Sequence, residues 1–173
     1  EYVAALAGEV ARRRALSDDE LHRQPTSFLV LVDPERISAL NRIPTAQGTV
    51  DSELGLHLRY VLMQGPAVGV HVIVTSSAMA ALTTVIGEPV IHHEMRHRLV
   101  TKVAEEDSFA LVRSSRASAL TNGNGRAATA LLFDSHSQLS TMFKPYSVSG
   151  TETGRVGPLS AQLGALFDRL TEE

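Results

Sequence analysis

The sequence predicts an α/β domain with a mainly parallel sheet, because two short apolar runs alternate with amphipathic helical stretches. The runs at residues 27–32 and 68–75 are rich in valine, leucine and isoleucine. Runs this short and this apolar are typical of strands buried on both faces of a parallel sheet. Asp33 follows the first run, and the second run closes on Thr75 and Ser76. We therefore expect a ligand site at this carboxyl edge, where open α/β sheets bind their ligands.

Composition sets the class of protein. With 173 residues, of which 43% are hydrophobic and 20% charged, the chain is the size of one globular domain. It contains no cysteine, which excludes disulfides and thiolate metal sites and favours a cytoplasmic location. No apolar run approaches the roughly 20 residues of a membrane helix, so we expect no membrane segment. The formal net charge is −3, so any nucleic-acid contact would have to come from a local basic patch.

The first part of the chain predicts helices on both sides of the first strand. Residues 2–15 carry apolar side chains at helical spacing, with three arginines at the carboxyl end, where the helix dipole favours cations. A capping-box pattern at residues 17–20 predicts a short helical turn before the strand at 27–32. A polar loop at residues 41–52 then leads to a predicted helix at 53–63. Because the chain opens at Glu1 within a helical pattern, we expect it to be part of a longer protein.

The second part continues the alternation of strands and helices. After the strand at 68–75, we expect a short helix at 78–86 and a third strand at 97–103. Three acids open a predicted helix at 105–114, where the helix dipole favours negative charge. A turn with two glycines at 122–125 comes after that helix.

The last predicted strands form a different kind of pair. Residues 128–133 and 139–143 are apolar segments joined by a short polar turn, so we expect them to pair in antiparallel fashion. Residues 147–157, rich in Ser, Thr and Gly, predict a linker. Apolar residues at helical spacing then predict an amphipathic C-terminal helix at 158–173.

The order of several short motifs resembles that of one known family. Six pieces carry the resemblance: the Walker-B-like 28–33, the strand 69–74 (Gly-Val-His-Val-Ile-Val), Arg98, the pair Asp107-Ser108, the turn 125–127 (Gly-Arg-Ala) and the closing 143–146 (Phe-Lys-Pro-Tyr). From about Phe28 to Tyr146, their order and spacing resemble the C-terminal half of the ATPase domain of FtsK/SpoIIIE-type DNA translocases, in the wider FtsK–HerA group.

The resemblance implies a partial RecA-like P-loop NTPase fold over residues 1–146, with ATP and Mg²⁺ as cofactors. It also implies assembly into a ring, expected to be a hexamer, that moves double-stranded DNA. In this scheme Asp33 holds Mg²⁺ and Glu35 polarises the attacking water. Thr75 and Ser76 then stand where such ATPases place a polar sensor of the γ-phosphate.

The same resemblance assigns two arginines to catalysis. Arg98 and Arg126 are candidates for arginine fingers that reach the phosphate of a neighbouring subunit. A structural role is the alternative at each site: a turn or helix cap for Asp33, and a surface or interface salt bridge for each arginine.

Two departures from the family pattern leave other functions open. The phosphate loop G-x-x-x-x-G-K-[ST] occurs nowhere in the chain, and in the family it would precede Glu1. In addition, Pro34 takes the place of the catalytic glutamate and displaces Glu35 by one residue. One alternative is a degenerate, non-hydrolysing RecA-like module kept for assembly or partner binding. Another is a relative of the ATPases that drive type VII protein secretion, whose substrate is protein.

The sequence also contains a short string that matches a known metal-binding pattern. Residues 93–97 match the zinc-protease pattern H-E-x-x-H. That pattern requires both histidines on one helix, a third ligand and an open coordination position. Because the string lies just before a predicted strand and lacks a convincing ligand helix downstream, we expect it to be a chance match.

Overall fold

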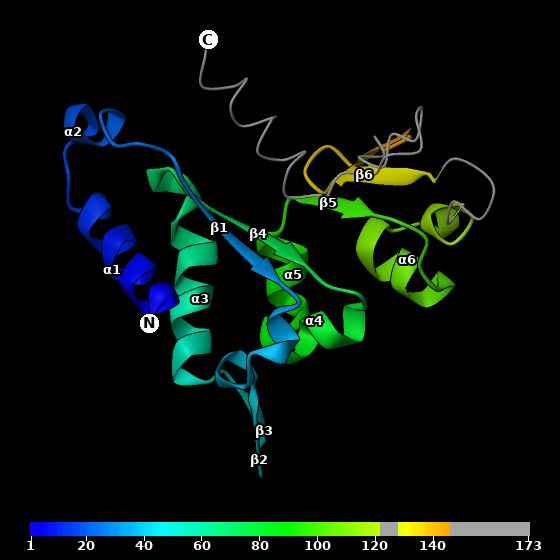
Figure 1. The fold of residues 1–173 in the computed structure, drawn as a ribbon, viewed down its shortest axis with the longest axis horizontal. Coiled ribbons are helices and arrows are strands. Elements are labelled where there is room, and N and C mark those ends of the chain that lie inside the picture. The colour runs from blue at the N-terminus through cyan, green and yellow to red at the C-terminus, as the bar shows by residue number, and fades with distance from the viewer. Residues whose placement is uncertain (122–127, 146–173) are drawn as a thin grey trace, which may run out of the picture.

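The computed structural model describes residues 1–121 and 128–145, in which helices pack against a parallel strand pair and a separate antiparallel sheet (Figure 1). The helices are α1 (Tyr2–Arg14), α2 (Asp18–His22), α3 (Glu53–Gln64), α4 (Met79–Val85), α5 (Glu88–Glu94) and α6 (Glu105–Val112). The strands are β1 (Ser27–Val32), β2 (Ile43–Thr45), β3 (Gly48–Val50), β4 (Val70–Thr75), β5 (His97–Val100), β6 (Ala130–Asp134) and β7 (Leu139–Phe143). Short 3-10 turns are η1 (Pro34–Arg36), η2 (Ser38–Leu40), η3 (Pro66–Val68) and η4 (Ser115–Ala117).

Strands β1 and β4 form the predicted parallel pair. Their register runs from Ser27 opposite Val70 to Val32 opposite Thr75, so both strands end at the same edge. Figure 1 shows the two strands side by side, with α3 in the connection between them. Gly69 ends the turn before β4 with a φ of +72°, a left-handed conformation that glycine adopts at little cost.

The two faces of this strand pair differ sharply in burial. On one face, Leu31 is buried, and Leu29, Val72 and Val74 pack against a core built largely from α3, α4 and α5. On the other face, Phe28 is 63% exposed, Val30 57%, Val32 66% and Ile73 48%. The expectation that β1 is buried on both faces is therefore wrong for the described residues: none of them covers this second face.

Arg13 anchors α1 to the start of the strand pair. Its side chain is almost fully buried and donates hydrogen bonds to the backbone oxygens of Pro25 and Val68 and to Ser27 Oγ. Its guanidinium also forms an ion pair with Glu9 one turn earlier in α1. Because several donors are satisfied at once, the buried charge is well compensated.

The remaining long strands form an antiparallel sheet in the order β5–β6–β7. The predicted antiparallel pair near 128–143 is confirmed as β6 and β7, joined in register from Ala130 opposite Phe143 to Asp134 opposite Leu139. Strand β5 also joins antiparallel, with His97 opposite Asp134. The α/β class is thus confirmed, but the prediction of a mainly parallel sheet is wrong, because in the described chain only β1 and β4 pair in parallel.

Three elements differ from the sequence-based expectation. Strands β2 and β3 form a hairpin within the region expected to be a loop, and α5 occupies the segment between the predicted helix at 78–86 and the third strand. Over residues 1–121 and 128–145, no helix has the length and apolar character needed to cross a membrane. The predicted linker at 147–157 and helix at 158–173 lie outside the described residues.

Candidate functional site at the edge of the parallel strands

Asp33 stands at the carboxyl end of β1 in an unusual backbone conformation. Its φ is +46°, in the left-handed region that Asp tolerates better than most residues other than glycine. Its backbone N–H donates to the carbonyl of Thr75 at 2.9 Å, which extends the pairing of β1 and β4 by one bond. The carboxylate is 32% exposed and lies 3.6 Å from the guanidinium of Arg36. Asp33 therefore presents an accessible carboxylate at the sheet edge, as the sequence predicted.

The turn after Asp33 returns Glu35 toward the end of β4. Pro34 is buried and begins η1, so the chain turns immediately after the strand. Ser76 Oγ lies 3.4 Å from each carboxylate oxygen of Glu35 and 3.1 Å from the carbonyl oxygen of Ala78. The one-residue displacement caused by Pro34 thus does not carry Glu35 away from the strand edge.

Four predicted site residues gather at this edge. Asp33 and Glu35 come from the end of β1 and from η1, whereas Thr75 is the last residue of β4 and Ser76 comes directly after it. Arg36, which pairs with Asp33, was not singled out from the sequence, although its spacing of three residues from an acid was a usable signal.

These groups can supply some of the ligands of a magnesium ion that also binds substrate phosphates, but they cannot supply a complete set of protein ligands. Carboxylate and hydroxyl oxygens are ligands that Mg²⁺ accepts, and it is commonly bound by one or two carboxylates together with substrate phosphates. In the described part of the chain, no three His, Cys, Asp or Glu side chains are grouped to hold a metal. Asp33 could therefore contribute one contact to a hydrated ion whose other partners are phosphate oxygens.

Arg98 occupies a structural position instead of an open catalytic one. The residue is only 6% exposed and donates hydrogen bonds to four backbone carbonyl oxygens, those of Met95, Leu111, Ile91 and His92, at 2.8 to 3.1 Å. Its guanidinium also lies 5.7 Å from the ring centre of Phe133. With its donors committed in this way, Arg98 ties β5 to α5 and α6 and has no free face for a phosphate group. Arg126, the other predicted finger, lies outside the described residues.

Ser108, from the pair Asp107-Ser108 noted in the sequence, is also structural here. The side chain is fully buried, and its hydroxyl donates to the carbonyl of Ser114 and accepts from the N–H of Ala117 at 3.0 Å. These two bonds join α6 to the turn η4 that comes after it.

The H-E-x-x-H string does not form a helical metal site. His93 lies in the last turn of α5, which ends at Glu94, whereas His97 is the first residue of β5. The two histidines therefore do not share one helical face, which the zinc-protease geometry requires.

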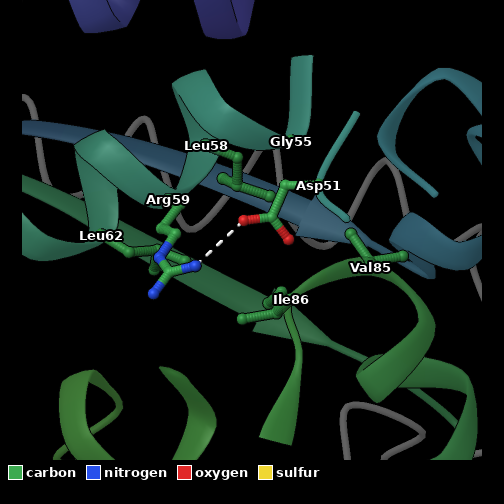
Figure 2. A pocket seen from close by; sticks show the side chains of 7 residues that line it. All are labelled: Asp51, Gly55, Leu58, Arg59, Leu62, Val85 and Ile86. Carbon is green, nitrogen blue, oxygen red and sulfur yellow. Dashed lines mark hydrogen bonds and ion pairs between the residues drawn. The ribbon is translucent and has the colours of Figure 1, made fainter. Parts of the chain in front are cut away.

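A recess beside α3 is filled by its own ion pairs (Figure 2). Asp51, with its side chain 8% exposed, accepts from Arg42 and Arg59 at 3.0 Å each. Figure 2 shows Arg59 reaching Asp51 across a floor of apolar side chains from α3 and α4 and the residue after α4. Because the free volume is close to 0 Å³, this recess has no room for a ligand.

Comparisons with family models, curated proteins and solved structures found no match to this chain.

Proposed function

We propose that this chain is part of a RecA-like ATPase of the FtsK–HerA type, which couples ATP to the movement of double-stranded DNA as a hexameric ring. The observation that carries the proposal is the gathering of Asp33, Glu35, Thr75 and Ser76 at the carboxyl edge of a parallel strand pair. Parallel sheets hold their ligands at this edge. The motif order along the chain supports the same class of protein.

In this proposal each residue of the edge has a separate task. Asp33 orients the water shell of Mg²⁺, and the metal, when bound with nucleotide, neutralises charge on the phosphates. Glu35 accepts a hydrogen bond from the attacking water and positions it. Thr75 presents its hydroxyl group toward the terminal phosphate. The single hydroxyl proton of Ser76 serves either Glu35, which lies 3.4 Å away, or the terminal phosphate. A phosphate loop, absent from these 173 residues, has to supply the clamp for the triphosphate.

Because Glu35 is displaced by one residue, a second function, that of a non-hydrolysing assembly module, is also considered. In a degenerate module used for assembly, Glu35 would only fix the turn after β1 through Ser76. Removing the negative charge of Glu35 while keeping its shape separates the two functions, because only a catalytic Glu35 needs that charge for turnover.

The experiment is a comparison of Glu35→Gln with unaltered protein, made in a protein that joins these residues to the expected phosphate loop. If Glu35 positions water, Glu35→Gln lowers kcat for ATP by about a hundredfold or more and leaves ATP affinity nearly unchanged. Glu53→Gln, an exposed carboxylate in the first turn of α3, is the matched control and should keep full activity. Equal turnover by Glu35→Gln and Glu53→Gln would remove Glu35 from catalysis.

A further inference from the structure

A separate pocket lies among α5, the end of α6 and the β6–β7 turn. Its volume is about 310 Å³, and its lining is His92, His93, Arg96, Arg113, Ser135 and His136. Every lining side chain is polar, five of the six are basic types, and none is acidic. The volume is at the small end of known ligand pockets, and such pockets usually have largely apolar walls. A pocket with this lining favours a small, negatively charged ligand.

Arg113 supports this interpretation through its backbone. It ends α6 with a φ of +55°, the left-handed position at which helices usually place glycine. A long side chain in this conformation is energetically costly, and such outliers are concentrated at functional sites. Its guanidinium donates to Gln138 Oε1 at 3.4 Å, and no carboxylate among the described residues forms an ion pair with it.

The remaining charges around the pocket leave Arg113 as the least compensated cation. Arg96 is held by Asp134 through two bonds of 3.0 and 2.9 Å, and His92 lies 3.4 Å from Glu88. Burial lowers the pKa of Arg98, and repulsion from the nearby charge of Arg113 lowers it further. The pocket therefore carries positive charge, and Arg113 has no carboxylate partner among the described residues. The C-terminal ends of α5 and α6 offset part of it.

The geometry points to a phosphate-binding pocket in which Arg113 is the principal charged contact and His92, His93 and His136 supply imidazole donors. The ligand class is a small phosphate anion, either inorganic phosphate or the terminal phosphate group of a mononucleotide. This pocket shares no residue with the edge formed by Asp33 and Glu35, so the inference does not depend on the proposed ATPase function.

The test is a titration of the 173-residue chain with inorganic phosphate and, separately, with AMP, followed by NMR of the histidine imidazole groups. Adenosine serves as the ligand control. We expect saturable shifts of His92, His93 and His136 with millimolar phosphate or AMP and none with adenosine. If AMP binds much more tightly than phosphate, the natural ligand is a nucleotide; if the two bind alike, it is the free anion. The absence of saturable shifts with both ligands would overturn the proposal.

Two substitutions separate binding from folding. Arg113→Gln should raise the Kd for phosphate by about tenfold or more, because a charged hydrogen bond is lost. Arg14→Gln, which removes one exposed positive charge from α1, should change the Kd by less than about twofold. Arg113→Gly should weaken binding equally while the Tm stays constant or rises, because glycine relieves the left-handed backbone. Equal weakening by Arg14→Gln and Arg113→Gln would show that only overall charge matters, which would contradict the pocket.

Discussion

Replacing Arg98 by methionine should strongly destabilise the fold. The substitution keeps the length and apolar stem of the side chain but removes donors to four backbone carbonyl oxygens. Each buried carbonyl left without a partner costs about 1–3 kcal/mol, but water can reach some of these oxygens after the change. We therefore expect a loss of about 3–5 kcal/mol in the free energy of unfolding. That is a large share of the roughly 5–15 kcal/mol available to a domain.

The assay is urea denaturation followed by circular dichroism, with two further variants. Arg98→Lys keeps the charge but presents its donors from a single point, so it should lose about half as much stability as Arg98→Met. Arg116→Met removes an exposed arginine whose guanidinium bonds to Ser140 Oγ, and should cost less than about 1 kcal/mol. If the free energy of unfolding of Arg98→Met lies within about 1 kcal/mol of that of the unaltered chain, the structural role of Arg98 is refuted. An arginine finger, which has to be free to reach a phosphate, would then again be the better explanation.

Four further predictions concern other parts of the chain. Gly65→Ala should cost about 1–3 kcal/mol in urea denaturation, because a Cβ there would collide with two backbone carbonyl oxygens; a neutral result would contradict the close approach of α3 and β4. The hydrogen bond from Arg12, and then that from Arg13, lowers the pKa of Glu9 to about 2, from 4.5 in the unfolded chain. Glu9→Gln should therefore cost about 1 kcal/mol at neutral pH, and this difference should shrink as pH falls from about 4.5 to about 2; a constant difference would rule out the carboxylate as its source. We expect the exposed apolar face of β1 and β4 to favour self-association. Val30→Thr on this face should therefore reduce self-association in light scattering with little change in Tm, whereas unchanged association would place the self-associating surface elsewhere. Isothermal titration of the 173 residues with ATP and Mg²⁺ should show no micromolar binding, because no phosphate loop is present; tight binding by a monodisperse monomer would contradict this.

Local signals in the sequence predicted the parallel pair and the edge beside it. The apolar runs located β1 and β4 to within two residues at each end, and the polar residues after them located Asp33 and Ser76 at one edge. The capping box predicted at Ser17 is also present, with Glu20 accepting from its backbone N–H. These features depend on neighbouring residues, so they can be inferred from spacing alone.

Features that depend on distant contacts could not be predicted in the same way. An apolar strand pattern does not specify its partner, so the antiparallel pairing of β5 with β6 was not foreseen. Helix α5 was not expected from the sequence, although Pro89 lies in its first turn, where proline is well tolerated. The pocket around Arg113 has no motif, because its residues come from three elements that meet only in the folded chain.

The most direct test of the proposed motor function is ATP hydrolysis measured with and without duplex DNA, in a protein that joins these residues to a phosphate loop. We expect ATP turnover that rises when duplex DNA is added and that is lost in Asp33→Asn. Asp18→Asn, which changes an exposed acid in α2, is the control and should keep full turnover. If the rate of ATP hydrolysis is unchanged by DNA but rises when a secreted protein is added, the chain belongs instead with ATPases that move protein. The absence of hydrolysis under all conditions would contradict the motor and favour a non-hydrolysing module.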